Sequence, residues 1–484
     1  TYDEDLGDVP RALQYEVRSR LHRIAVLTSN ALSDRLRSNG VILMKSGEVG
    51  SQPSDQTKNA AEVQPDKEDK FMHKALICLI SITLFIHSHP SLAQSSNDAL
   101  PEARDVLERS VSSGKLNFVV AAVGNTDGQT WSHAAGFQDV EKASPAAPEN
   151  IIQIASMTKL ITTIAALQLV EDGKLDLDVP ISVYAPELDE LQVLKGFDAN
   201  DKPVFIKATR APTARELMTH TAGYVYEFWN ANALKGGQLG IIPSVFGEGN
   251  YLEAPLAFQP GTSWAYGINT DWLGVLVERL SGQRLADYFD EHIFSSLGMR
   301  DTFYELPEDR LDRCGTVMAR TGDGLVPLPS FQPTPMKKGS MAHYSGGGGL
   351  FSTVKDYGRV LQMLLKGGSI DGKTLLKPQT VDDMFDSQIG NISPAALDSV
   401  MPNISNTADL SFGNRATFGL GLLLHTGGIE GGRRPFSGSW AGLFNSYYWI
   451  DREAGMYGIF GTQVLPFYDN IAIEALLEFE QAVY

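Results

Sequence analysis

Apolar runs typical of β-strands occur in two parts of the chain, one early and one late. Residues 117–137 hold two such runs around an Asp-Gly pair, which predicts a β-hairpin. Residues 416–425, 443–451 and 454–464 are dense in β-branched and aromatic residues, and Gly-rich or Asp-Arg-Glu turns separate them. This late pattern predicts an antiparallel meander.

Helical spacing of apolar residues predicts helices between and beyond these strands. Residues 98–114 and 470–484 show this spacing at the two ends, and residues 269–294 predict two amphipathic helices separated by Ser281-Gly282. Residues 175–345 combine helical patterns with proline-containing loops. We expect an α+β fold: an antiparallel β-sheet flanked by helices, shared by the hairpin and the meander, with a mostly helical second subdomain.

The first 71 residues differ in composition from the rest. Residues 46–70 are polar and short of large apolar side chains, as a disordered linker would be. We interpret residues 1–71 as an upstream extension, or one added in cloning, that is disordered or loosely helical and lies outside the fold.

Residues 72–93 have the anatomy of a secretory signal peptide. Met72 to Lys74 form a short basic start, residues 75–86 are apolar, and residues 91–93 offer small side chains for cleavage. A buried core helix is the alternative, because the run is shorter than the roughly 20 residues that span a bilayer. We expect a periplasmic or secreted protein with no membrane span after cleavage.

Residues 94–484 then form one domain with a buried core, since hydrophobic residues make up 43% of the chain. Its α/β part is expected at about 98–155 and 346–484, and its helical part at about 156–345. One of the two cysteines falls in the signal segment. Cys314 alone remains, which leaves no internal disulfide and no cysteine-based zinc site.

The charge of the chain and the absence of several motifs narrow the range of candidate functions. The net charge of -18 comes without a basic stripe, which argues against nucleic-acid binding. The sequence has no G-x-S-x-G elbow, no His-Glu-x-x-His and no phosphate-binding loop. The Gly-rich residues 345–353 predict close backbone packing. His133 and His220 stand alone and are expected to be structural, and we expect neither a metal nor an organic cofactor.

The pattern Ser-x-x-Lys occurs three times, in different contexts. The copy at residues 112–115 contains a glycine that breaks helical geometry, and the copy at residues 352–355 is a helix start capped by Thr353. Ser156 instead enters a helix after an apolar run, which places it about 5–6 Å from Lys159 on one face. A nearby base makes a serine hydroxyl nucleophilic, and a lysine in a dry pocket can serve. A helix-capping serine is the alternative.

Two later segments add candidate groups. Tyr266 follows a Pro-Gly turn just before a helix, and a tyrosine beside an ammonium group ionises more easily and can act as a base toward serine. The alternative for Tyr266 is a core aromatic residue. Trp440, Ala441 and Gly442 open a predicted strand, where backbone N–H groups can face a substrate carbonyl.

Taken together and in order, these segments resemble the serine β-lactamase and penicillin-binding-protein superfamily, in the class C β-lactamase-like branch that includes family VIII carboxylesterases. The resemblance runs from about residue 100 to the end, and its landmarks are IASMTKLITTIAALQLVEDGKLDLDVPISVY, RELMTHTAG, PGTSWAYG, SGGGGLFSTVKDYGRVLQMLL and SWAGLFNSYYWID. It implies that Ser156 is acylated, that Lys159 is its partner, and that Tyr266 takes and returns the proton. It also implies an oxyanion hole formed by the N–H groups of Ser156 and Leu443.

The chain departs from class C β-lactamases at two motifs. Those enzymes carry Tyr-x-Asn, whereas Ile268 stands here and Asn269 comes one place late. They also carry Lys-Thr-Gly. At that place this chain has Trp440-Ala441-Gly442, a form like that of the family VIII esterases. Residues 425–427 are an alternative placement, but a Gly-rich loop separates them from the strand predicted to begin at Leu443. Without the lysine, a substrate carboxylate has no cationic partner. Neutral esters are therefore expected to be better substrates relative to β-lactams.

We therefore expect an exported serine hydrolase that cleaves small carboxylic esters through an acyl-enzyme on Ser156. The alternatives are a β-lactamase or D-alanyl-D-alanine carboxypeptidase, and a catalytically silent module that binds peptidoglycan or a partner. The expected substrate is a small-molecule ester or a β-lactam. The oligomeric state is not predicted.

Overall fold

The computed structural model describes residues 99–484 except residues 113 and 248. These residues belong to one compact unit. The predictions for residues 1–71 and 72–93 fall outside the described residues. Across the described part, no helix has both the length and the apolar character that crossing a bilayer requires.

An eight-stranded antiparallel sheet forms the centre of the fold, in the order β12-β13-β14-β15-β16-β1-β2-β3. Its strands are β1 (Phe118–Asn125), β2 (Gly128–Asp139), β3 (Ser144–Pro145), β12 (Ala416–Phe418), β13 (Leu423–His425), β14 (Ser437–Gly442), β15 (Ser446–Asp451) and β16 (Met456–Gly461). Val120 of β1 pairs with Gly461 of β16, so the early hairpin and the late meander share one sheet, as predicted.

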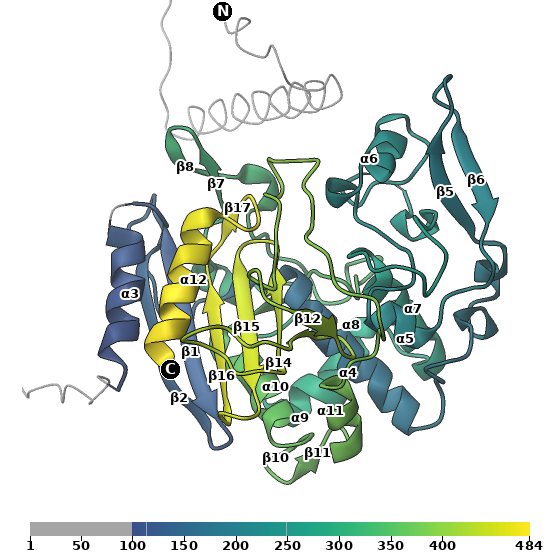
Figure 1. The fold of residues 1–484 in the computed structure, drawn as a ribbon. Helices are drawn as coiled ribbons and strands as arrows, with labels where there is room; N and C mark the ends of the chain where they lie inside the picture. The colour runs from purple at the N-terminus through teal and green to yellow at the C-terminus, as the bar shows by residue number, and fades with distance from the viewer. Residues whose placement is uncertain (1–98, 113, 248) are drawn as a thin grey trace, which may run out of the picture. The chain divides into compact units, whose positions relative to one another are not determined.

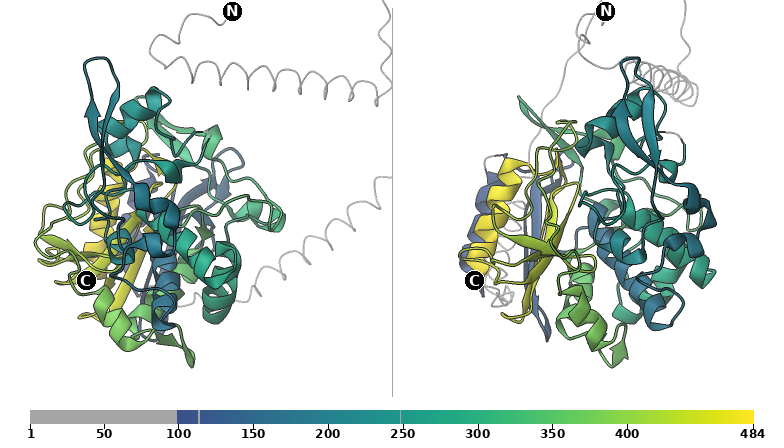
Figure 2. Two further views of the ribbon diagram at one scale, coloured as in Figure 1. Left: turned by 90° about the vertical axis from the view of Figure 1, so that its right-hand side faces the viewer. Right: turned by 45° about the vertical axis from the view of Figure 1, so that its right-hand side comes forward.

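Helices cover both faces of this sheet (Figures 1 and 2). The terminal helices α3 (Pro101–Ser112) and α12 (Asn470–Val483) pack together on one face, where the Phe479 ring lies 5.9 Å from both the Trp131 and the Trp449 rings. On the opposite face, Tyr357 of α10 (Val354–Leu365) meets Tyr448 of β15 with ring centroids 5.3 Å apart. The predicted α+β class is confirmed.

The helical part lies beyond α10, and α4 (Thr158–Glu171) runs through it. Nearly every residue of α4 is buried, as expected for a helix that is apolar on all sides. Its other helices are α5 (Ala214–Met218), α6 (Ala231–Gln238), α7 (Asn269–Ser281), α8 (Leu285–Phe289) and α9 (Ser295–Leu297), and α11 (Pro378–Met384) follows α10. Gly282 takes a left-handed conformation between α7 and α8, where the sequence predicts the break.

Short strands complete the fold. They are β4 (Ile152–Gln153), β5 (Gln192–Phe197), β6 (Pro203–Lys207), β7 (Met318–Thr321), β8 (Gly324–Pro327), β9 (Phe351–Ser352), β10 (Ser369–Ile370), β11 (Lys373–Thr374) and β17 (Val464–Leu465). β4 pairs with β9, so the chain enters and leaves the helical part at neighbouring points. This pairing brings the residues after β4 close to the Gly-rich residues before β9.

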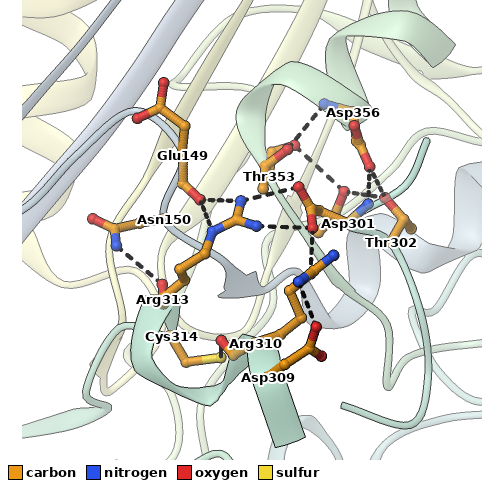
Figure 3. A network of polar contacts seen from close by, with 11 residues as sticks. Glu149, Asn150, Asp301, Thr302, Asp309, Arg310, Arg313, Cys314, Thr353 and Asp356 are labelled. Atoms are coloured by element: carbon orange, nitrogen blue, oxygen red, sulfur yellow. Dashed lines mark hydrogen bonds and ion pairs between the residues drawn. The ribbon is translucent and has the colours of Figure 1, made fainter. Parts of the chain in front are cut away.

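A polar network holds the chain just before β4 (Figure 3). Asp301 accepts hydrogen bonds from Arg310 and Arg313 at 2.9–3.0 Å. Arg313 also donates to the Glu149 carbonyl at 2.7 Å, and the Asn150 side chain donates to the Arg313 carbonyl at 3.0 Å. The network therefore fixes the segment that leads into the candidate site.

Two predicted strand boundaries are wrong. Residues 416–425 form the hairpin β12–β13 rather than one run, because Gly421 adopts a positive φ of 76° between them. The strand predicted to begin at Leu443 begins at Ser446. Residues 443–445 form a tight turn in which Asn445 has a φ of 61° and its N–H bonds the Gly442 carbonyl. Residues 440–442 consequently end β14 instead of opening the next strand.

Candidate active site

Ser156 lies in a 3₁₀ turn, Ala155–Met157, between β4 and α4. Ala155 has a φ of 42°, which an alanine rarely adopts and which turns the strand abruptly into the helix. The N-cap of α4 is Met157, without a side-chain capping bond, and the turn has no side-chain cap either. The alternative of a helix-capping serine is therefore not supported, and Ser156 is free to face a cavity that it lines.

Lys159 lies one helical turn after Ser156 and is only 3% exposed. Its Nζ donates hydrogen bonds to the Gly347 carbonyl at 2.7 Å and to the Tyr226 hydroxyl at 3.0 Å. The same Nζ stands 4.9 Å from the centre of the Tyr266 ring. A protonated amine has three N–H donors, so one remains after these two bonds.

Tyr266 lies just before α7, is buried, and lines the same cavity as Ser156. Its hydroxyl accepts a hydrogen bond from the Trp440 indole at 3.2 Å. His220 packs behind both rings: it meets Tyr266 edge-on at 4.7 Å and stacks with Trp440 at 6.0 Å. Burial, and secondarily the charge of Lys159, lower the pKa of His220 well below its usual value, so the ring is neutral. It supports the site without lining the cavity.

The end of β14 lies directly against the Ser156 turn. A Cβ built on Gly442 would come within 2.4 Å of the Ile154 carbonyl oxygen, so only glycine allows this approach. Leu443 follows in the turn, and within the described chain its N–H donates to no backbone carbonyl. Ser156 and residues 440–443 all line one cavity. An oxyanion hole between the two N–H groups fits this arrangement.

The alternative placement of the third motif at residues 425–427 does not fit the structure. His425 is fully buried on β13 and hydrogen-bonds Ser439 at 2.7 Å. It does not line the cavity. His133 is likewise remote from the cavity and pairs with Glu108 on the surface at 2.8 Å, which fits the predicted structural role.

Several polar groups of the site were not identified from the sequence, among them Tyr226, Asp271 and the Gly347 carbonyl. Asp271 on α7 is 2% exposed and accepts hydrogen bonds from Tyr251 at 2.8 Å and from the Gly347 N–H at 3.2 Å. The signals for them were weak. Tyr226 closely follows the RELMTHTAG landmark, Asp271 lies one turn beyond Tyr266, and Gly347 lies in a run interpreted only as packing.

The cavity has a volume of about 350 Å³ and a predominantly aromatic and aliphatic wall. Apart from the residues already placed, its lining includes Phe228, Trp229, Val245, Phe246, Phe331, Leu397, Leu410 and Phe467. Asp271 is the only charged side chain among the described lining residues, and none of them is lysine, arginine or histidine. A carboxylate substrate would find no cationic partner on this wall.

Comparison with known proteins gives concordant results. A family model described as Beta-lactamase matches residues 103–480. Acyltransferase calJ of Penicillium decumbens is 34% identical over 70% of this chain and 82% of its own length. Lovastatin esterase of Penicillium rubens is 31% identical over 78% of this chain and 96% of its own length. The unliganded structure of simvastatin synthase (LovD) from Aspergillus terreus is similar with a TM-score of 0.66 and 29% identity, over 79% of this chain and 97% of that one.

The family match spans most of the chain, and the similar structure shares the sheet flanked by helices described above. The relatives are named as acyltransferases and an esterase, which are enzymes that act on acyl groups. The chain therefore belongs to the beta-lactamase family and is an enzyme of the serine-hydrolase class.

Proposed function

We propose that this protein hydrolyses small, neutral carboxylic esters through an acyl-enzyme on Ser156. The observation that carries the proposal is the convergence of the Ser156 turn, the end of β14 and Tyr266 on one aromatic cavity, with Lys159 buried beneath. A nucleophile, a base and two backbone donors around one opening are the parts that acyl transfer needs.

In the proposed acylation step, Tyr266 takes the proton of Ser156 while Oγ attacks the ester carbon. The positive charge of Lys159, 4.9 Å from the Tyr266 ring centre, favours this transfer. The N–H groups of Ser156 and Leu443 stabilise the negative oxygen of the tetrahedral intermediate. The bond to the alcohol oxygen then breaks, the proton that Tyr266 took is returned through the site to the departing alcohol, and the acyl group stays on Ser156. Water activated by Tyr266 attacks the acyl carbon, releases the acid and restores the serine.

The cavity wall favours neutral substrates over carboxylated ones. β-Lactams and peptides ending in D-alanine carry a carboxylate that must lose water on binding, and such a loss needs a paired cation. The lining residues offer Asp271 instead, whose charge has the same sign as the substrate carboxylate. Trp440 occupies the place where class C enzymes are expected to carry their lysine. We place β-lactamase and carboxypeptidase activity second for this reason.

Acyl transfer to an alcohol is a further candidate, favoured by the apolar cavity beside Ser156. An apolar alcohol bound there would exclude water and attack the same acyl-enzyme in its place. Similar proteins are named acyltransferase calJ and simvastatin synthase, which supports this candidate. A silent binding module does not account for the assembled nucleophile and base.

The test compares p-nitrophenyl butyrate and nitrocefin on one preparation, with Ser156→Ala as the matched control. We expect kcat/KM for the ester to exceed that for nitrocefin by at least about 30-fold, because one missing charge partner costs about 2–5 kcal/mol. Ester turnover should disappear in Ser156→Ala. Fast nitrocefin cleavage without ester cleavage would reverse the order of the candidates.

Export remains part of the proposal, with residues 72–93 as the signal peptide and residues 94–484 as the released protein. Its support is the basic start, apolar run and small residues of that segment. We place the α/β part at about 98–155 and 346–484, and the helical part between them. Amino-terminal sequencing of protein secreted into the medium should begin near residue 94, and a retained, uncleaved chain would contradict export.

A further inference from the structure

Among the described residues, three tyrosines line the cavity, and their hydroxyls have different hydrogen-bond partners. Tyr251 donates to the Asp271 carboxylate at 2.8 Å, so its proton is committed. Tyr266 accepts from the Trp440 indole at 3.2 Å. Tyr226 accepts from the Lys159 ammonium at 3.0 Å. Since these partners differ in their ability to give up a proton, the three phenols cannot serve the same purpose.

Tyr226 keeps its own proton available to the cavity. Its oxygen is an acceptor toward Lys159, and among the described residues no acceptor takes its O–H. Burial first, and then the charge of Asp271, raise the pKa of Tyr226 well above its usual value, so it stays protonated. A protonated phenol can still protonate an alkoxide, because an alkanol is the weaker acid.

Of the three phenols, Tyr226 is the one that a hydrogen bond joins to the Lys159 ammonium, whereas Tyr251 contacts His343 at 3.5 Å and is bonded to Asp271. The Lys159 ammonium can replace a proton that Tyr226 gives away, through the 3.0 Å hydrogen bond that already joins them. The Trp440 indole N–H stabilises charge on Tyr266 but does not ionise at the pH of an enzyme. Two titratable groups held in contrasting surroundings are the usual sign of separate acid and base roles.

We propose that Tyr226 is a further catalytic residue, the general acid that protonates the departing alkoxide of the ester. This assignment rests on the proposed function and concerns the same site. As the bond between the acyl carbon and the alcohol oxygen breaks, the electron pair stays on that oxygen, which takes the Tyr226 proton. Lys159 reprotonates Tyr226, and the proton that Tyr266 took from Ser156 passes to Lys159. One proton thus moves from Ser156 to the alcohol, and every side chain is restored.

The assignment is tested with two esters that differ only in the leaving group, ethyl butyrate and p-nitrophenyl butyrate. Ethoxide needs a proton in order to leave, whereas p-nitrophenolate does not. Both esters give the same butyryl-enzyme, so any difference arises in acylation. Tyr226→Phe removes the O–H and keeps the ring that stacks on Phe228 at 5.0 Å. We expect the ratio of kcat/KM for the p-nitrophenyl ester to that for the ethyl ester to rise by about 10²-fold or more.

Tyr251→Phe is the matched control, because it removes a phenol from the same cavity that is bonded to Asp271 rather than to Lys159. That variant should leave the ratio between the two esters near the wild-type value, whatever happens to the absolute rates. Equal losses for both esters in Tyr226→Phe would overturn the acid role and leave Tyr226 as a group that merely positions Lys159.

A measurement on the unaltered protein covers the case in which Tyr226→Phe does not fold. Across a series of butyrate esters with increasingly basic leaving groups, kcat/KM should fall only shallowly when an acid assists, and a steep fall would overturn the assignment. A different result would contradict the proposed function itself. If Ser156→Ala still turns over p-nitrophenyl butyrate, the acyl-enzyme account is wrong, whereas Ser156-dependent turnover with equal Tyr226→Phe losses removes only the acid.

Discussion

A single methyl group at Gly442 should impair catalysis more than it impairs folding. Gly442 ends β14 against the segment that leads to Ser156, and an added Cβ would lie 2.4 Å from the Ile154 carbonyl oxygen. It would also lie 2.3 Å from Ser446 Oγ. The serine side chain can rotate away, but the carbonyl belongs to the backbone, so the strand end and the turn must separate.

The structure sets the size of this displacement. Ordinary contact begins at 3.4 Å, so relief of the 2.4 Å approach requires about 1 Å of movement between the strand end and the turn. The two proposed oxyanion donors, Ser156 and Leu443, lie on opposite sides of that junction. Loss of one such donor lowers kcat by about 10²–10³-fold. Overpacking of this kind costs about 1–3 kcal/mol of folding free energy, which a typical domain tolerates.

Hydrolysis of p-nitrophenyl butyrate gives kcat for Gly442→Ala, and urea unfolding gives its stability. Gly322→Ala is the control, because a Cβ at Gly322 meets nothing within 4 Å and should leave kcat unchanged. A folded Gly442→Ala protein with the full wild-type kcat would refute the argument that the β14 end and the Ser156 turn together form the oxyanion hole.

Two further predictions concern the proton-transfer groups and the polar network. Lys159→Ala and Tyr266→Phe should each lower kcat for p-nitrophenyl butyrate by at least about 10²-fold while circular dichroism stays native, and a full rate in Tyr266→Phe would exclude it as the base. Burial raises the pKa of Asp301, but hydrogen bonds from Arg313 and the charges of Arg313 and Arg310 outweigh this and hold it below its usual 3.8. The ionised Asp301 carboxylate therefore stabilises the folded protein above about pH 4. This stabilisation is lost as the pH falls through the lowered pKa that Asp301 has in the folded state. Asp301→Asn should cost about 1–3 kcal/mol at pH 7 in urea unfolding and less at pH 3, and a constant difference would contradict the linkage.

Sequence reasoning can propose those parts of the candidate site whose geometry is local. Ser156 and Lys159 are three residues apart at a helix start, and helical spacing alone brings them to one face. The strand pattern likewise predicted that the early hairpin joins the late meander, which the pairing of β1 with β16 confirms. The turn after Gly442 was missed because Leu443 and Phe444 are strand-like, although Asn445 is a residue that tolerates a positive φ.

The remaining parts depend on contacts between distant segments. Tyr226 is 67 residues from Lys159 and Gly347 is 188, and neither contact has a local sequence signature. Tyr266 was a candidate because it follows a Pro-Gly turn just before a helix, and the family resemblance then implied its role. Asp271 shows why a polar residue on a helix is hard to assign, because only the fold decides whether it meets water or a buried glycine loop.

The central claim is that Ser156 is the nucleophile, and covalent labelling tests it most directly. A fluorophosphonate probe followed by peptide mapping should place one label per chain on Ser156, and the Ser156→Ala protein should remain unlabelled under the same conditions. A wild-type protein that takes no label, or one labelled equally well after Ser156→Ala, would contradict the account.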